Sequence, residues 1–571
     1  MFKGLSGRWW ALVVAMLFGT AVFPAQAADE FRVRPYLQNP TSHEVTVRWL
    51  SESNQAGTVV IDGKTYSSTP VQAAALDYQA SEPTADRYSG LPYLHTVRVE
   101  GLQANTAYDY QVTNGTGSLG GSFRTPLTSA TAGGLTAGQG VRLFVYGDSE
   151  TEPESIGKKT EWTPSLAPGS TRPNWVNGQY VATQTEGYAQ NLAIIQSRAA
   201  DAQSNGLATL VSVAGDLVES GGEQRDWDEF WRHNAGDRGS LASNVAIIPA
   251  FGNHENYGGP GALGGYNAAA AQAAADKFRT YFEVADNGQS NVEVAPGTYA
   301  DHTGRYHRTN FGPVTLITVD SSNGGTNGTA NDTNFYLDSA ANPQIPDYEP
   351  GSAQYAWLES QLAAAQAYGQ IVFVQYHHAA YSAGIHGQEP GTGTGQDNQS
   401  GQPMRALTPL LAQYDVKAVF SGHDEMYEHA VVDGIHFFDI GIGGDGLRGT
   451  TFGSPDYLQE YLAQTDAPEV WDGNVLLSGG KHYGHLEIDA IFNAEGQWDV
   501  TLTPVYAFPI LSSTDPGQII GWERRAYDDA VTFTTVPEPG TGLLVLSGIA
   551  AGLLVHYRRR RACIQRTCDQ G

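Results

Sequence analysis

The stretch LVSVAGDLVES, residues 210–220, contains an apolar run that ends at Asp216. A second stretch, VAIIPAFGNHE, residues 245–255, repeats this pattern and reaches Asn253. Short runs of valine, isoleucine and alanine that are bounded by glycine are typical of buried strands in an α/β sheet. Because a buried strand cannot hide a carboxylate, we expect Asp216 and Asn253 just beyond the strand ends, where such sheets bind ligands.

Three more apolar runs end in the same way. VRLFVYGD ends at Asp148, IVFVQYHH ends at His377 and His378, and VKAVFSGHDE contains His423. Together the runs carry aspartate, asparagine and histidine to the ends of separate strands. Oxygen and nitrogen ligands gathered at one rim predict a metal cluster. The alternative is that an aspartate such as Asp148 caps a helix after a strand–helix turn.

The order GD, GD, GNHE, H and GH resembles that of the calcineurin-like metallophosphoesterases, and among them the purple acid phosphatases. The resemblance covers residues 141–505 and is specific because all of these motifs occur in the same order. It implies an α/β (α+β) sandwich of two β-sheets flanked by helices. It also implies a pair of metal ions and hydrolysis of small phosphate monoesters by attack of a metal-bound hydroxide.

The resemblance assigns a metal ligand to each of the motifs. Asp216 matches the carboxylate that bridges the two metal ions, and Asp148 matches a terminal ligand of the first ion. The second ion would be held by Asn253, His377 and His423. We expect two divalent or trivalent ions drawn from iron, manganese and zinc.

The first metal site departs from the purple acid phosphatase pattern at two positions. Glu219 stands where those enzymes carry a tyrosine, so the charge transfer that colours them should be absent. Glu425, in GHDE, stands where the second histidine of GHxH belongs. We interpret this site as rich in oxygen, with Asp148 and Asp216 joined by Glu425 and by Glu219 or Glu150. Such a set favours Mn²⁺, Mg²⁺, Ca²⁺ or Fe³⁺ over Zn²⁺. The alternative is that Glu425 faces solvent and the site is weak or empty.

Two histidines are candidates for catalysis. His254 matches the family's histidine that contacts the substrate phosphate, and His386 lies where relatives place a histidine near the leaving group. Either could donate a proton to the departing alkoxide. Further along, Tyr427 and Glu428 resemble the YER that follows GHxH, with His429 in place of the arginine.

Composition narrows the classes of partner. The chain has 571 residues, 41% hydrophobic and 16% charged, which is typical of more than one globular domain. Its net charge of −28 repels nucleic-acid backbones, so no nucleic-acid binding is expected. An anionic substrate would therefore be captured locally, by metal. The only cysteines are Cys563 and Cys568, so no disulfide can staple the core. They form either a redox or metal pair or part of a dispensable tail.

The N-terminal part contains two expected segments before the catalytic domain. Residues 1–27 combine a basic start, an apolar core and an Ala-Gln-Ala site, which predicts a secretory signal or, alternatively, an uncleaved anchor. Residues 28–125 alternate as strands do, and GLQANTAYDYQV resembles the GLxPxTxYxY corner of fibronectin type III domains. The same sandwich precedes the catalytic domain of many purple acid phosphatases. Residues 126–140 are a linker by composition.

The catalytic domain is expected over residues 141–511, with strands alternating with helices, and a second linker over 512–535. Apolar residues at three- and four-residue spacing predict helices at 186–203, 268–282 and 352–369. Residues 536–571 resemble a PEP-CTERM sorting tail, with Pro-Glu-Pro, an apolar segment at 541–557 and then four arginines. The resemblance implies transient membrane insertion, cleavage and delivery to the surface or exopolysaccharide of a Gram-negative bacterium. A permanent transmembrane helix is the alternative.

Two other functions stay open from the sequence. A phosphodiesterase or nucleotidase would use the same fold and ligands. A cell-surface or matrix binding protein with a degenerate metal site would explain the altered GHxH. The retained aspartates, asparagine and histidines favour the enzyme, because a scaffold does not need so many metal-type groups at strand ends.

Overall fold

The computed structural model describes residues 30–84, 87–128, 134–153, 184–322, 344–387, 400–450, 461–463, 470–472, 475–514 and 518–536. The expected signal sequence and the sorting tail with its apolar segment at 541–557 lie outside these ranges. Among the helices in these ranges, none combines the length and the apolar character that crossing a membrane requires.

The N-terminal part is an all-β pair of sheets, each with four strands in the described residues. In the strand Tyr93–Glu100, alternate residues such as Val97 and Val99 are buried, because successive side chains of a strand face opposite sides. The first sheet has the order β1 (Val33–Gln38), β2 (Glu44–Ser51), β6 (Tyr93–Glu100) and β5 (Val71–Gln72), which leads into η2 (Ala74–Leu76). The second has the order β4 (Lys64–Ser67), β3 (Thr58–Ile61), β7 (Ala107–Asn114) and β8 (Gly117–Arg124).

The first catalytic sheet combines parallel and antiparallel strands. Its parallel part is β9 (Gly140–Tyr146), β10 (Ala208–Val213) and β11 (Ala246–Pro249). Every residue of β10 is buried, as expected of a parallel strand covered on both faces. The antiparallel part continues from β9 through β23 (Gly484–Phe492), β24 (Trp498–Leu511) and β25 (Ile519–Ala526), and β26 (Val531–Thr535) also pairs with β24.

This sheet corrects one expectation from the sequence. Residues 512–535 were expected to form a linker, but they contain β25 and β26, which pair with β24. The reason is that β24 is long enough to pair with both strands, one near each of its ends. The interpretation from composition missed this long-range pairing.

The second catalytic sheet lies against the first. Its order in the described residues is β14 (His307–Phe311), β15 (Val314–Thr318), β16 (Ile371–His378), β17 (Ala418–Gly422), β19 (Ile435–Ile440), β18 (Tyr427–Val432) and β20 (Tyr461–Ala463). Strands β15, β16, β17 and β19 are parallel, so the carboxyl ends of β16 and β17 lie at one rim.

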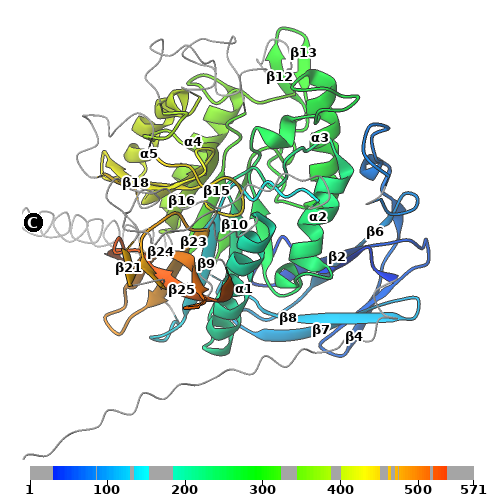
Figure 1. The fold of residues 1–571 in the computed structure, drawn as a ribbon, viewed down its shortest axis with the longest axis horizontal. Coiled ribbons are helices and arrows are strands. Elements are labelled where there is room, and N and C mark those ends of the chain that lie inside the picture. Colours follow the sequence, from blue (N-terminus) through cyan, green and yellow to red (C-terminus); the bar gives the residue numbers. More distant parts are fainter. Residues whose placement is uncertain are drawn as a thin grey trace, which may run out of the picture.

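Helices cover the outer faces of the sheets (Figure 1). The sequence predicted helices at 186–203, 268–282 and 352–369, and α1 (Gln184–Ser204), α3 (Ala268–Tyr281) and α4 (Ala353–Ala367) confirm them. Helix α1 contacts β10 and α4 contacts β16. The remaining elements are α2 (Gln224–Ala235), α5 (Thr408–Gln413), η4 (Leu241–Ser243), η5 (His254–Asn256), η6 (Gln402–Leu407), and the hairpins β12–β13 (Val292–Ala295, Thr298–Ala300) and β21–β22 (Val470–Asp472, Val475–Ser478).

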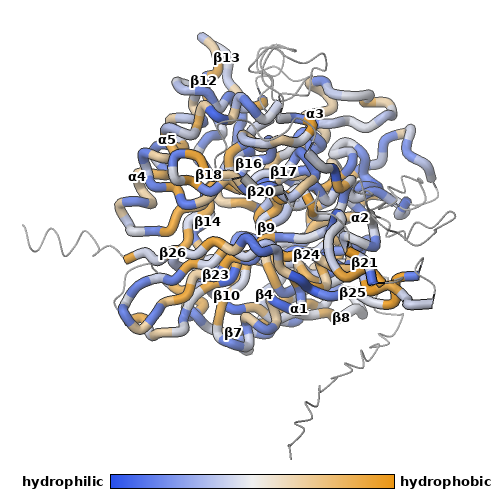
Figure 2. Tube along the Cα trace, turned by 60° about the vertical axis from the view of Figure 1, so that its left-hand side comes forward, coloured by the Kyte–Doolittle hydropathy of each residue, from blue (hydrophilic) through white to orange (hydrophobic). Residues whose placement is uncertain are grey.

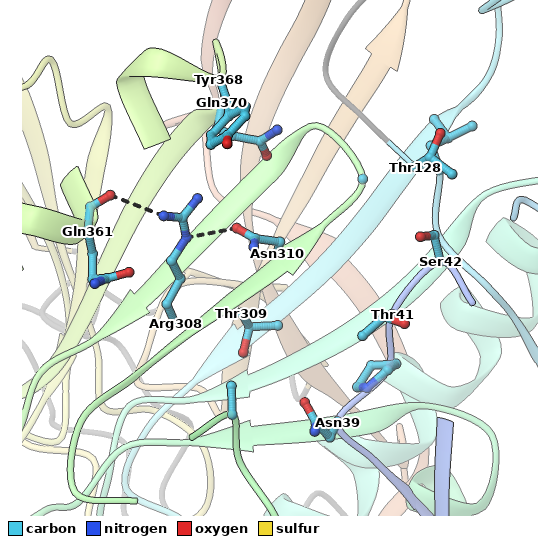
Figure 3. Close-up of a pocket in the computed structure, with 14 residues that line it drawn as sticks. Asn39, Thr41, Ser42, Thr128, Arg308, Thr309, Asn310, Gln361, Tyr368 and Gln370 are labelled. Atoms are coloured by element: carbon cyan, nitrogen blue, oxygen red, sulfur yellow. Dashed lines mark hydrogen bonds between the residues drawn. The ribbon is translucent and has the colours of Figure 1, made fainter. Parts of the chain in front are cut away.

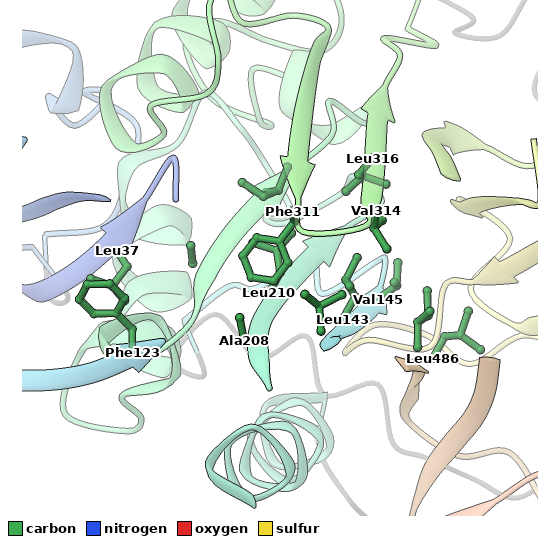
Figure 4. Packing of buried hydrophobic residues seen from close by; sticks show 14 of the residues in the cluster. Leu37, Phe123, Leu143, Val145, Ala208, Leu210, Phe311, Val314, Leu316 and Leu486 are labelled. Atoms are coloured by element: carbon green, nitrogen blue, oxygen red, sulfur yellow. The ribbon is translucent and has the colours of Figure 1, made fainter. Parts of the chain in front are cut away.

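The core lies between the two catalytic sheets. Leu143, Leu210 and Leu486 of the first sheet meet Phe311 and Leu316 of the second, and all are buried (Figure 4). Hydrophobic stretches gather along the strands in the middle of the molecule, whereas the surface loops are more hydrophilic (Figure 2). The mixed α/β sandwich with an all-β N-terminal part confirms the expected fold class.

The N-terminal part packs tightly against α2 and α3 of the catalytic part (Figure 1). The side chain of Arg32 is buried and donates to both oxygens of Asp228 on α2, at 3.2 and 3.3 Å. The Tyr78 hydroxyl donates to Asp228 Oδ2 at 2.5 Å. Tyr36 also packs against Trp231, with ring centroids 4.3 Å apart and the ring planes tilted by 39°. A buried ion pair and aromatic packing therefore hold the two parts together.

A polar hollow lies elsewhere between the N-terminal part and the second sheet (Figure 3). Its volume is about 610 Å³, and Asn39 and Thr41 line one side of it. On the other side Arg308 donates to Asn310 Oδ1 at 2.9 Å and to the Gln361 carbonyl at 3.3 Å. No residue predicted to bind metal lines this hollow, so it is separate from the site described below.

Asp228→Ala should destabilise the protein strongly. Because Arg32 would stay buried without its partner, we expect the free energy of unfolding to fall by about 3–5 kcal/mol. Urea unfolding followed by fluorescence measures this change. As a control, Glu283→Ala removes the exposed pair with Arg98, whose side chain is 50% exposed, and should cost less than about 1 kcal/mol. Equally small effects of both substitutions would contradict the assigned role of the buried pair.

Candidate metal centre

Four of the predicted ligands converge at the rim where the two catalytic sheets meet. His377 Nε2, from the end of β16, lies 2.9 Å from Asp216 Oδ2 and 2.8 Å from Asn253 Oδ1. His423 Nδ1, just after β17, lies 3.0 Å from the same Asn253 oxygen. Asp216, His377 and His423 each offer one ligand atom within 4.8 Å of the others, and all three are buried. One carboxylate, one amide oxygen and two imidazoles therefore surround a single point.

The backbone at these strand ends is held in an unusual conformation. Asp148, Asp216 and His423 have positive φ angles of 54°, 51° and 78°. Non-glycine residues adopt such angles at a cost of about 1–3 kcal/mol each, usually at functional sites. A Cβ atom on Gly252 would overlap the Asp216 carboxylate, so only glycine allows the chain to approach it here. The strained turns aim the ligand side chains at one another.

A group of carboxylates adjoins this point. Asp148, Glu150 and Asp216 are buried and bring one oxygen each within 4.8 Å of the others. Asp148 Oδ2 accepts the backbone N–H of His423 at 2.7 Å, whereas its Oδ1 accepts no hydrogen bond in the described part of the chain. Asp216 belongs to both groups. Its carboxylate therefore lies between the imidazole group and the carboxylate group.

The two glutamates that depart from the family pattern join the carboxylate group through Glu150. Glu425 and Glu150 form a further close group with Asp445, and Glu219 forms one with Glu150 and His254. Glu425 is only 4% exposed and its Oε1 lies 2.5 Å from Arg448 Nη2, so it does not face solvent. Asp148 lies between the two halves of the site, because its Oδ1 is 3.6 Å from His377 Nδ1, and Glu150, Glu425 and Asp445 form the acidic group beside it.

Burial makes this concentration of negative charge unfavourable without a cation. Burial raises the pKa of Asp148 to about 7, and it raises the pKa values of Glu150 and Glu425 well above their usual range, with Asp445 adding to both. Burial opposes ionisation of Asp216 as well, but His377 and His254 hold its pKa at about 2. The donor set therefore fits two cations, one among oxygens and one among Asp216, Asn253 and the imidazoles.

His254 lies at the edge of the carboxylate group. Its backbone N–H donates to Asp216 Oδ1 at 2.9 Å, and its Nδ1 lies 2.6 Å from the carbonyl oxygen of Glu219. Because a carbonyl only accepts, Nδ1 carries the hydrogen. The Nδ1 atom also lies 4.0 Å from Glu150 Oε2. The residue that the resemblance assigns to the substrate phosphate thus lies beside both halves of the site.

His386 reaches the site from a separate loop. Its ring stacks on His423 with centroids 3.9 Å apart. Its Nδ1 lies 2.8 Å from Asp424 Oδ1, which also accepts the His386 backbone N–H at 2.8 Å. Asp424 therefore anchors the His386 loop through the backbone N–H and lies against the ring nitrogen. His378 is different, because its Nδ1 contacts Ser321 Oγ at 2.8 Å behind the site.

Sequence reasoning missed two residues of the site. Asp445 follows β19 in the run IGIGGDG, which ends on glycine and aspartate as the other motifs do and could have been found in that way. Glu255, inside the GNHE motif, received no role. Its carboxylate accepts the backbone N–H groups of Asp216, Leu217 and Gly252 at 2.9, 2.8 and 2.8 Å. Glu255 therefore ties the Asp216 loop to the Asn253 loop.

Comparison with known families agrees with this geometry. Residues 186–425 match the model of calcineurin-like phosphoesterases, and residues 31–128 match the N-terminal domain of purple acid phosphatases. The chain therefore contains a calcineurin-like phosphoesterase domain. It is a metal-dependent phosphoric ester hydrolase, as the sequence predicted.

Solved structures share the fold of this phosphoesterase. Purple acid phosphatase PPD1 from yellow lupin (Lupinus luteus) seeds is 17% identical, with a TM-score of 0.53 over 87% of this chain and 73% of the lupin chain. PhoD is 12% identical, with a TM-score of 0.50 over 90% of this chain and 92% of its own. No curated protein matches the chain in sequence.

Glu255→Gln should weaken metal binding by this phosphoesterase. The substitution removes the negative charge of the acceptor. It also places an NH₂ donor where a carboxylate oxygen now accepts backbone N–H groups. Since groups that orient metal ligands typically contribute 10- to 100-fold, we expect a loss of about that size in metal affinity. Titration of metal into chelator-treated protein measures it. An unchanged affinity would contradict the role assigned to Glu255.

Metal binding in the oxygen-rich half of the site should depend on Glu425 and Asp445. In protein purified without added metal, Glu425→Gln combined with Asp445→Asn should remove about one metal equivalent, because two negative charges of the acidic group around Glu150 are lost. The second ion should remain. Elemental analysis of the wild type and the variant measures both. Equal zinc in both sites of the wild type would contradict the asymmetry.

Proposed function

We propose that this phosphoesterase hydrolyses small phosphate monoesters outside the cytoplasm. The observation that carries the proposal is the convergence of Asp216, Asn253, His377 and His423 beside the carboxylates of Asp148 and Glu150. The likeness to purple acid phosphatase supports a monoester substrate. A binding protein without turnover is less well supported, because the altered positions keep acidic groups that can hold a cation.

Each half of the site would hold one metal ion. Asp148, Asp216 and Glu150, with Glu425 and Asp445 beside them, would hold the first, and Asp216, Asn253, His377 and His423 would hold the second. When bound, the pair supplies Lewis acidity and lowers the pKa of a bound water to about 7. The strong net negative charge of the chain gives no long-range attraction to a phosphate ester, so capture depends on this local positive charge.

The histidines would bind and protonate the substrate. The Nδ1 atom of His254 is held by the Glu219 carbonyl. Its Nε2 is therefore the nitrogen that would contact the substrate phosphate. His386 is fixed by Asp424 in the same way, so its Nε2 is the nitrogen that exchanges a proton with the leaving alkoxide. The stacking of His386 on His423 places this proton donor next to a metal ligand.

The site of action follows from the ends of the chain. Residues 1–27 have the pattern of a secretory signal, and residues 536–571 have that of a PEP-CTERM tail. We therefore infer export and delivery to the cell surface or exopolysaccharide. Fractionation of cells that express the full chain or a chain truncated after residue 535 tests this step. Identical distribution of both forms would contradict a sorting role for the tail.

Chelator-treated protein should hydrolyse p-nitrophenyl phosphate faster than its bis ester once Mn²⁺ or Zn²⁺ is added. Asp216→Asn should lower kcat/KM by more than about 100-fold, because it affects a direct ligand of both ions rather than an orienting group. Asp415→Asn is the matched control, since Asp415 is exposed and has a φ of 54° beside the 51° of Asp216. It should leave the rate unchanged.

The same assay distinguishes the alternatives. A faster rate with the bis ester would replace the monoesterase with a phosphodiesterase of the same fold. Silence on both esters with every metal would instead favour a binding protein. Titration with each metal then shows whether the site is intact, so loss of binding and loss of turnover are told apart.

A further inference from the structure

A second buried cluster of carboxylates lies behind the metal centre. Asp424, Glu428 and Asp439 are all buried, and each brings one carboxylate oxygen within 4.8 Å of the other two. Glu428 on β18 and Asp439 on β19 are directly opposite each other in the antiparallel pair. Like charges in such cross-strand positions destabilise a sheet. The repulsion between the two is relieved either by a shared proton or by a bound cation.

The cluster faces away from the core between the two sheets. On β19, Asp439 shares its face with Ile435 and Phe437, which pack among residues of α4 and α5. Phe438 and Ile440 occupy the opposite face and belong to the core between the sheets. The acidic cluster is thus on the helix-covered side of the second sheet and is not part of the dinuclear site.

Two oxygens in the cluster have no hydrogen-bond donor. Within the described ranges, neither Asp424 Oδ2 nor Asp439 Oδ2 accepts a hydrogen bond, although the two residues are 0% and 3% exposed. Their other oxygens are used, since Asp424 Oδ1 holds His386 and Asp439 Oδ1 accepts the N–H of Gly441 at 3.0 Å. Buried carboxylate oxygens without partners are costly, and a coordinated cation removes this cost.

We propose that Asp424, Glu428 and Asp439 bind a third cation, separate from the catalytic pair. The three donors are carboxylates, and no cysteine is present in the described residues, so the site selects a hard divalent ion. Ca²⁺ fits best, because it accepts several carboxylates in flexible geometry, whereas Mg²⁺ demands near-octahedral geometry and keeps most of its water. The Ser382 hydroxyl, which donates to Glu428 Oε1 at 2.5 Å, adds a further polar group beside the cluster.

The third cation would also act on the catalytic site through Asp424. One oxygen of Asp424 would bind the ion while the other fixes Nδ1 and the backbone N–H of His386. Glu428 meanwhile accepts the backbone N–H of Ala383 at 2.8 Å, in the loop that leads to His386. The ion would therefore hold the His386 loop against β18 and β19. Asp424 is a positioning residue in this arrangement.

The experiment compares full-length variants after chelation, by thermal unfolding with and without Ca²⁺ and by equilibrium dialysis with ⁴⁵Ca²⁺. The isosteric variant Glu428→Gln with Asp439→Asn removes two charges from the third site, and Asp216→Asn weakens the catalytic pair. Asp415→Asn, at an exposed aspartate, is the control. Saturating Ca²⁺ should raise the Tm of the wild type, the control and Asp216→Asn by at least about 3 °C.

The double variant Glu428→Gln with Asp439→Asn should respond less to Ca²⁺ than the other three proteins. It should bind about one Ca²⁺ fewer than the wild type and show a clearly smaller shift in Tm, because only the catalytic site is left to bind Ca²⁺. In chelator it should unfold at a higher temperature than the wild type, because its charge repulsion is gone. Either of two results would overturn the proposal. One is a double variant that unfolds at a lower temperature than the wild type in chelator, and the other is a wild type whose Tm does not change with Ca²⁺. A shift that disappears in Asp216→Asn and persists in the double variant would also overturn it, since Ca²⁺ would then occupy only the catalytic pair.

Discussion

The contact between Asp216 and His377 is the interaction on which the site depends. Asp216 follows β10 of the first sheet and His377 ends β16 of the second, so their 2.9 Å contact joins the two sheets at the rim. The other Asp216 oxygen accepts the backbone N–H of His254. A small shift of either sheet would separate the two ligands. The core that the sheets share prevents such a shift. Core packing therefore sets the accuracy of the metal centre.

The same rim concentrates unfavourable features that only a ligand can offset. Asp148, Glu150, Asp216 and Glu425 all have positive φ angles and are all buried. Strained backbone and buried like charges both lower stability, and evolution tolerates them where function requires them. Metal binding offsets these costs, and tighter binding stabilises the folded state more. Folding and metal binding of this phosphoesterase should therefore be coupled.

The asymmetry of the site has a chemical consequence. Its acidic half carries Glu219 and Glu425 where the resemblance expects a tyrosine and a histidine, and Asp445 lies close to Glu425. The other half keeps the amide and imidazole ligands. A hard ion beside a borderline ion would still polarise the phosphate, but without charge-transfer colour. The family mechanism thus has room for a different metal pair within the same fold.

The sequence by itself determined the α/β class, the all-β N-terminal part, the three long helices and the ends of the strands that carry Asp148, Asp216, Asn253, His377 and His423. Those features depend on local patterns, since an apolar run and the polar residue that ends it are neighbours in the chain. Local patterns could not predict three other features. These are the pairing of β25 and β26 with β24, the hydrogen bonds by which Glu255 joins two loops, and the contact of Glu425 with Asp445. They depend on which distant strands are neighbours and on loop conformation, because a carboxylate acquires its partner, whether an amide, an arginine or a cation, only when the folded chain brings one to it.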